Sequence, residues 1–466
     1  MRFVFVARWL VLLSSAAELV KGLLSTHPIN DGLTKKHCKS KHVHRGTSRF
    51  EGDESKKDDD TRFFQELRER AQELSQQTQE LTSKWRTGDC RSKLPLVFAD
   101  WVRRIDIDYP LVACGSSRET VFLGHLETGE ILAESTFSID DDESNDEARR
   151  DEKSVDDLDL MQTMRFLFGN YDGGGTLSIA FQDSLICEGG RKGGVRVWRT
   201  NPTSNRLVSQ GSIPAMEGLL ATCLHIDDND RLWVGTHKGE VHCYRLDDPF
   251  QPLALQTKPY KSWTFGRRMS CVMSLELCVE FSCGVATLAG GSVEFFSTNE
   301  NEAVGLASLY PPFDSMERRP ANIYPSQASF VLSKKNKNSD DISGLSIVCG
   351  GSDGSMYSQS ISLTNYNQDI DRDRPFQEPL EPMGQGHPGG GIIKAMVSPT
   401  YDMLVSLGQD GCMKVWDMQK RTPFYHFAGY KVWTGSLWTD GRRIASDGVD
   451  NTVLLHDFAG SDDELY

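Results

Sequence analysis

The sequence lacks the short motifs by which many enzymes are recognised. It has no phosphate-binding loop pattern and no Gly-x-Ser-x-Gly elbow, so neither loop-based nucleotide chemistry nor serine esterase chemistry is indicated. Its glycine runs, at 170–178 and 387–393, lead into strand-like segments, and no helix N-terminus follows that would hold a phosphate. We therefore predict no catalytic residue and no cofactor.

Clusters of positive charge are also missing from the body of the chain. The 466 residues carry 51 Lys and Arg against 66 Asp and Glu, which gives a net charge of −15. Proteins that bind nucleic acid hold its phosphates with clustered Lys and Arg. The charge pattern therefore argues against nucleic acid and leaves other proteins as the expected partners.

Metal-ligand spacings are absent too. The eleven cysteines are odd in number and lie mostly in apolar runs such as "LVACG" and "SIVCGG", as small buried residues do in a reducing compartment. The group Cys271, Cys278 and Cys283 lacks the paired spacing of a zinc site. A histidine group in one strand-rich segment shows no third ligand, and we interpret its members, His225, His237 and His242, as structural. We predict no metal site.

The N-terminus has the composition of targeting sequences. Residues 1–20 hold an early Arg, an apolar stretch and small residues, which resembles a secretory signal; Arg8 interrupts the stretch, which is also too short for a good membrane span. Residues 21–60 form a basic, transit-like segment followed by a polar linker. Within it, "HCKSKHVH" (37–44) is interpreted as basic targeting sequence rather than a metal site.

Together these two segments resemble the bipartite presequences of algae with secondary plastids. We favour plastid import, with mitochondrial import and secretion as alternatives, and expect no membrane span in the mature protein.

An amphipathic helix is predicted over 61–88, ending near Gly88. Apolar and small residues recur at alternating spacings of three and four, at Phe64, Leu67, Ala71, Leu74, Thr78, Leu81 and Trp85. The helix either packs on the domain that follows or serves self-association or tethering to a partner.

A unit of apolar run, tight polar turn and alternating strand recurs through the rest of the chain. The copies lie at 114–126, 187–200, 233–246, 286–298, 349–361, 406–418 and 445–458. Their equivalent positions hold Gly124, Trp198, Tyr244, Phe296, Gln359, Trp416 and His456, spaced by 74, 46, 52, 63, 57 and 40 residues. The shorter spacings match the period of about 40–45 residues of four-stranded propeller blades, and polar surface loops explain the longer ones.

These units resemble WD-repeat propellers, most closely in the sixth copy. The resemblance implies a buried hydrogen-bonded tetrad of His387, Ser406, Asp410 and Trp416. The seventh copy keeps Ser446 and Asp450 but has His456 in place of Trp, and the second has Lys192 in place of Asp. We therefore predict an all-β fold, a seven-bladed propeller of four-stranded antiparallel blades, over 93–460.

The ring needs a closing strand, because the last unit runs out of sequence before its fourth strand. An apolar run upstream of the first unit, about 94–99, is spare. We predict that it forms the outer strand of the last blade and joins the two ends of the domain. Residues 461–466 would then be an acidic tail.

An acidic insertion, 138–160, separates the first two units. Its central stretch 140–159 has eleven acids and three basic residues. It is either a solvated loop or a docking loop for a basic partner.

The resemblance implies a non-catalytic scaffold or complex-assembly factor that binds proteins through its loop faces. The alternative is a propeller enzyme, a hydrolase or lyase, with a site at the mouth of the central channel.

Overall fold

The structure is a computed structural model. It describes residues 54–135, 175–190, 193–201, 206–246, 256–265, 271–299, 305–310, 324–334, 342–361, 376–388, 391–430, 434–449 and 451–460. The signal-like segment, residues 21–53 of the transit-like segment, the acidic insertion and the acidic tail all lie outside these ranges. The chain divides into two compact units, Met1–Asp89 and Cys90–Tyr466.

The first unit contributes one helix, α2 (Glu54–Thr87). It begins seven residues before the predicted start, so the end of the predicted linker was wrong. The predicted stop is confirmed: Gly88 has a φ of 74° and donates its N–H to the Lys84 carbonyl at 2.9 Å.

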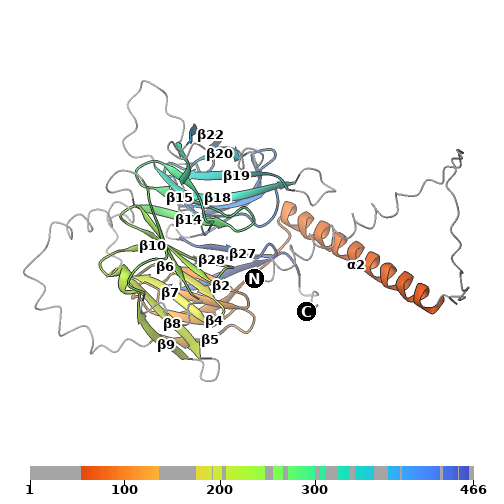
Figure 1. The fold of residues 1–466 in the computed structure, drawn as a ribbon, viewed down its shortest axis with the longest axis horizontal. Helices are drawn as coiled ribbons and strands as arrows, with labels where there is room; N and C mark the ends of the chain where they lie inside the picture. Colours follow the sequence, from red (N-terminus) through yellow and green to blue (C-terminus); the bar gives the residue numbers. More distant parts are fainter. Residues whose placement is uncertain are drawn as a thin grey trace, which may run out of the picture. The chain divides into compact units, whose positions relative to one another are not determined.

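The second unit is a seven-bladed β-propeller, as predicted (Figure 1). The first blade is β2 (Val102–Asp108), β3 (Leu111–Ser116), β4 (Val121–His125) and β5 (Glu130–Glu134). The second is β6 (Thr176–Gln182), β7 (Leu185–Gly190), β8 (Val195–Asn201) and β9 (Arg206–Ser212). A short 3-10 helix, η2 (Pro214–Met216), leads to the third, which is β10 (Ala221–Asp227), β11 (Arg231–Thr236), β12 (Glu240–Arg245) and β13 (Lys261–Thr264).

The remaining blades follow in chain order. The fourth is β14 (Val272–Cys278), β15 (Cys283–Leu288), β16 (Val293–Ser297) and β17 (Gly305–Tyr310). The fifth is β18 (Pro325–Lys334), β19 (Ile342–Gly351), β20 (Ser355–Ile361) and β22 (Glu381–Gln385). The sixth is β23 (Ile393–Val397), β24 (Met403–Gly408), β25 (Cys412–Asp417) and β26 (Thr422–Ala428). The seventh is β27 (Leu437–Thr439), β28 (Arg443–Val449), β29 (Thr452–Asp457) and β1 (Arg91–Val97).

Strand β1 closes the ring, as predicted, but begins and ends two to three residues earlier than expected. It pairs antiparallel with β29, from Arg91 opposite Asp457 to Val97 opposite Thr452. A register shift between Lys93 and Leu96 accommodates Pro95, which has no N–H to give to the ladder.

A fifth strand, β21 (Phe376–Pro379), adds to the fourth blade and pairs parallel with its outer strand β17. Polar loops were expected in the longer spacings between units, but the polar stretch "DRPFQEPLEPMGQG" in one of them holds both β21 and β22. Parallel addition covers the backbone edge of β17, which would otherwise be open to pairing with another chain.

The apolar core lies between neighbouring blades rather than inside any one of them. One cluster joins Trp198 and Ile186 of the second blade to Leu123 of the first, and another joins Trp233 of the third to Phe296 of the fourth. This arrangement is expected when each sheet must bury both faces against its neighbours.

Side-chain hydrogen bonds tie the innermost strands to one another near the ring axis. Ser178 donates to the Ala221 carbonyl at 2.7 Å, Thr222 to the Val272 carbonyl at 2.6 Å, and Ser326 to the Ile393 carbonyl at 2.7 Å. Three further junctions between blades are also joined by hydrogen bonds. Arg104 Nε donates to the Leu177 carbonyl, the Ala328 N–H donates to Ser274 Oγ, and the Ile105 N–H donates to Ser436 Oγ.

Candidate functional site

The four residues of the predicted tetrad meet in the sixth blade. The Trp416 indole N–H donates to Ser406 Oγ at 2.8 Å, and His387 Nε2 lies 2.8 Å from the same oxygen. The other ring nitrogen of His387, Nδ1, lies 2.9 Å from an Asp410 carboxylate oxygen. With a neutral imidazole every donor has an acceptor: Trp416 to Ser406, Ser406 to His387, and His387 to Asp410.

Burial keeps this network internal. His387 and Ser406 are fully buried, and burial lowers the pKa of His387 even though Asp410 opposes the shift. Gly408 makes room for the ring, because a Cβ there would stand 2.2 Å from His387 Nδ1. The tetrad therefore holds the connection before β23 against the β24–β25 turn; His387, Ser406 and Trp416 are buried, and Asp410 lies in the exposed turn.

The position of Trp416 is filled differently in the seventh blade. His456 Nδ1 lies 2.6 Å from Ser92 Oγ of the closing strand, and its Nε2 lies 2.7 Å from the Tyr430 hydroxyl. The ring stacks on Phe427 with centroids 4.4 Å apart. Burial lowers the pKa of His456 to about 4, so the ring is neutral at pH 7.

A serine beside a histidine held by a third group is also the arrangement of an activated nucleophile. Here the pair occupies a core position between the sixth and seventh blades and the closing strand, and the ring is 4% exposed. We assign Ser92 and His456 to the attachment of β1. Asp450, predicted to belong to this unit's network, lies outside the described residues.

The second blade places a buried ion pair where the sixth has its serine. Glu188 aligns with Ser406 and binds Arg196 through both carboxylate oxygens, at 2.6 and 2.8 Å. Thr176 donates to the same carboxylate at 2.9 Å. Burial raises the pKa of Glu188 to about 7, and Arg196 opposes that shift. Lys192 lies outside the part of the chain that the structure describes.

The histidine and cysteine groups do not assemble into a metal centre. His237 Nδ1 accepts the Leu220 N–H at 3.0 Å, and His242 Nδ1 lies 2.9 Å from Ser262 Oγ. Cys278 and Cys283 are direct cross-strand partners in the β14–β15 hairpin. Across the described ranges, no three His, Cys, Asp or Glu side chains are grouped so as to hold an ion.

One face of the ring carries the first and third turns of every blade, because strands alternate in direction. We call it the turn face. The three closest cation–aromatic pairs among the described residues lie on it: Arg443 over Tyr109 at 4.0 Å, Arg245 over Tyr260 at 4.0 Å, and Lys334 over Tyr401 at 4.5 Å. Arg245 and Tyr260 are exposed, the latter by 39%.

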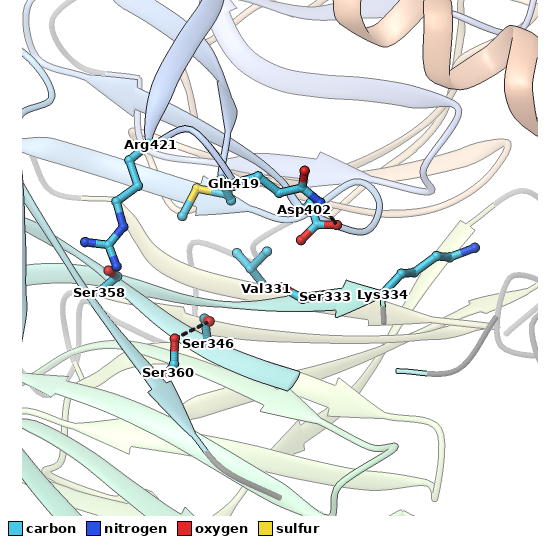
Figure 2. A pocket seen from close by; sticks show the side chains of 10 residues that line it. Val331, Ser333, Lys334, Ser346, Ser358, Ser360, Asp402, Gln419 and Arg421 are labelled. Carbon is cyan, nitrogen blue, oxygen red and sulfur yellow. Dashed lines mark hydrogen bonds between the residues drawn. The ribbon is translucent and has the colours of Figure 1, made fainter. Parts of the chain in front are cut away.

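A polar groove opens on the turn face between the fifth and sixth blades (Figure 2). Its volume is about 260 Å³, and its lining residues are Val331, Ser333, Lys334, Ser346, Ser358, Ser360, Asp402, Met418, Gln419 and Arg421. In Figure 2, Arg421 and Lys334 lie at opposite ends, with Asp402 and Gln419 between them.

Strand alternation explains why the groove exists. Toward the fourth blade, the long β18–β20 sheet presents Leu332, Leu345 and Ile361, which pack in an apolar cluster. Toward the sixth blade, the adjacent residues are Ser333, Ser346 and Ser360. Small polar side chains cannot fill the space between two sheets, so the blades separate here.

Two contacts close the ends of the groove. Near the ring axis, the Asp402 N–H donates to the Leu332 carbonyl at 2.9 Å. At the outer rim, Arg421 of the sixth blade pairs with Glu381 of the fifth at 2.9 Å, and both side chains are exposed, by 43% and 64%. Sequence reasoning missed the groove, although two of its serines, Ser358 and Ser360 in "SMYSQSI", alternate along one strand.

Neither a family model nor a curated protein matches this sequence. Within the described residues, no helix has the length and apolar character needed to cross a membrane.

Proposed function

We propose that the protein is a non-catalytic interaction scaffold of the WD-repeat type, which binds other proteins through its turn face. The observation that carries the proposal is that the three closest cation–aromatic pairs of the described residues lie on that one face, together with the groove. Tyr and Arg are the residues in which the binding energy of protein interfaces concentrates. A pre-paired guanidinium on an aromatic ring is also already ordered, so less entropy is lost on binding.

The WD-repeat assignment is supported by the geometry of the sixth blade. His387, Ser406, Asp410 and Trp416 form the linked hydrogen bonds that the family resemblance implies. The other blades keep the strand order without the full tetrad: the second has Glu188 at the Ser406 position, and the seventh has His456 at the Trp416 position.

Affinity purification with surface variants tests the scaffold. The full chain with Arg245→Ala and Tyr260→Ala should lose partners that the wild-type protein retains. A matched control, Arg118→Ala with Lys238→Ala, alters two exposed cations at the β3–β4 and β11–β12 turns on the opposite face and should retain them. Equal retention by both double variants, or no reproducible partner of the wild-type protein, would refute the assignment of binding to the turn face.

The proposal extends to the location and the helix. The signal-like and basic segments support import into a plastid, where α2 would act as a tether or self-association arm. A full-length fluorescent fusion should colocalise with chlorophyll fluorescence. Light scattering with and without residues 1–88 should show a mass per particle that depends on the helix, and identical subunit numbers would argue against the arm.

A further inference from the structure

We propose that the groove between the fifth and sixth blades binds an extended peptide, and that a carboxylate of the peptide replaces Glu381 as the partner of Arg421. This deepens the scaffold function and rests on it, because it assigns one class of partner segment to one place on the turn face. The argument uses the size of the groove, its lining and the ion pair at its outer end.

The size of the groove suits a peptide better than a cofactor. Small-molecule sites usually enclose about 300–1,000 Å³, and this groove holds about 260 Å³ and is open to solvent along the turn face. In an extended peptide alternate side chains point to the same side, so two of them, one residue apart, would enter together. Val331 and Met418 give these side chains an apolar surface for their stems.

The lining selects polar side-chain tips. Ser346 and Ser360 are cross-strand partners with hydroxyls 3.4 Å apart, and each can donate or accept a hydrogen bond. Asp402 accepts a hydrogen bond from the Gln419 amide at 3.1 Å and lies between Arg421 and Lys334 (Figure 2). Lys334, at the axial end, lies over the Tyr401 ring at 4.5 Å, with the Asp402 carboxylate on the same side of the groove. We therefore place the acidic residue of the peptide at the other end, beside Arg421.

The ion pair between Arg421 and Glu381 is one in which a peptide carboxylate can replace Glu381. It spans the gap from one blade to the next, and solvent reaches both partners. Exposed pairs of this kind contribute little to stability, so opening it costs little. Arg421 holds Glu381 through one contact, from Nη2 to Oε2 at 2.9 Å. A peptide carboxylate in the two-pronged geometry that guanidinium groups favour would recover what Glu381 gives up.

Three labelled octapeptides provide the probe: alternating Ser–Glu, alternating Ser–Gln and alternating Ser–Lys. Alternation puts every charged residue on one side of the extended chain, so the register does not matter. Fluorescence polarisation with the full-chain protein should show that the Ser–Glu peptide binds about tenfold tighter than either of the others, as expected for one charge-assisted contact.

Two variants should then act in opposite directions. Glu381→Gln removes the internal competitor and should tighten Ser–Glu binding about twofold to fivefold. Arg421→Gln removes the cation and should weaken binding about tenfold or more. Lys420→Gln is the matched control, because it deletes one positive charge from the same turn at a residue outside the groove, and it should change affinity less than about twofold.

Several results would overturn the proposal. One is no Ser–Glu binding at millimolar concentration, and another is equal binding of all three peptides. A preference for Ser–Lys would mean that the acids select a basic segment, and parallel weakening by Glu381→Gln and Arg421→Gln would give the pair a structural role. If partners are captured through Arg245 and Tyr260 while these tests fail, the scaffold stands and only the groove assignment is wrong. If the peptide binds as expected while no partner is captured, the groove assignment stands and the assignment of partner binding to Arg245 and Tyr260 is wrong.

Discussion

Ser406 joins two buried rings of the sixth blade through one hydroxyl. It accepts from the Trp416 indole and lies within hydrogen-bonding distance of His387, and all three groups are shielded from water. A buried donor or acceptor that loses its partner keeps the full cost of its desolvation. A single oxygen atom therefore determines whether two large side chains are satisfied.

Removing that oxygen should destabilise the protein without changing its fold. Ser406→Ala leaves the indole N–H and the imidazole Nε2 unpaired, and we expect the free energy of unfolding to fall by about 1–3 kcal/mol per orphaned group. Urea denaturation followed by circular dichroism measures this loss. Ser360→Ala, at an exposed position, should change the free energy by less than about 0.5 kcal/mol. Equal effects of the two substitutions would contradict the assigned network.

His456 should make stability depend on pH in one defined window. The pKa is about 4 in the folded protein because of burial, against about 6.5 in the unfolded chain. Between pH 4 and pH 6.5, His456 is protonated in the unfolded chain but stays neutral in the folded protein. Its contribution to the free energy of unfolding is therefore complete above pH 6.5 and is lost as the pH falls toward 4.

A substituted protein isolates this effect from other titrating groups. The difference in unfolding free energy between the wild type and His456→Gln should shrink by about 2 kcal/mol from pH 7.5 to pH 5, since one proton is worth about 1.4 kcal/mol per pH unit. Buried acids such as Glu188, whose folded pKa of about 7 is raised by burial, act in the opposite sense in both proteins and cancel. A difference that stays constant with pH would refute the expectation.

At the scale of elements, β21 shows how an insertion can protect a sheet. It leaves the fifth blade and pairs with β17 of the fourth, with Ala307 opposite Phe376 and Tyr310 opposite Pro379. An uncovered outer strand is a template for pairing between molecules. The parallel pairing is short, so it adds little to the stability of the fold. Its main effect is to cover the β17 edge against pairing with another molecule.

Replacing 376–379 with a Gly-Ser sequence separates these two contributions. We expect the melting temperature to fall by only a few degrees, because few backbone bonds are lost. Self-association should increase with concentration, because the edge of β17 becomes available, and light scattering over a concentration series would reveal it. The same substitution of 362–365, outside the strand, is the control. A monomer at every concentration would show that β21 does not guard the edge.

The elements that sequence could predict are those whose signal is local. The strand–turn–strand unit repeats, so its period was enough to predict the blades, and the tetrad followed from the resemblance of the sixth copy to WD-repeat propellers. The pairing of β21 depends on β17, some 70 residues earlier, and its four residues carry no alternation of their own. Likewise, no pattern near His456 points to Ser92, which lies 364 residues away. The groove was missed because the serines forming it match ordinary exposed strand positions until the neighbouring blade is placed.

For the whole molecule, the decisive feature is that the two ends of the domain share one blade. Strand β1 supplies the outer strand of the last blade, and the ring is continuous only when it is in place. Leu96 from this strand occupies the space beside Gly124, the residue that stands at the Trp position of the first blade; a Cβ on that glycine would lie 2.6 Å from the Leu96 side chain. The first and last blades are thus matched in shape at the point of closure.

Strand β1 should therefore carry a large share of the stability of the ring. Leu96→Ala removes a side chain that is 1% exposed and should cost about 2–5 kcal/mol, while Val97→Ala, at a neighbouring position that is 68% exposed, should cost less than about 0.5 kcal/mol. Deleting 90–98 also removes Phe98 and the ladder to β29, a loss comparable with the total stability of about 5–15 kcal/mol of a typical protein. Thermal unfolding of the three variants measures the series.

Because each blade is buried only by its neighbours, opening one junction exposes surfaces on both sides, and the deletion should abolish a single cooperative transition. A deletion variant that melts like the wild type would mean that the ring is held by its inner-strand hydrogen bonds and blade cores without its closing strand.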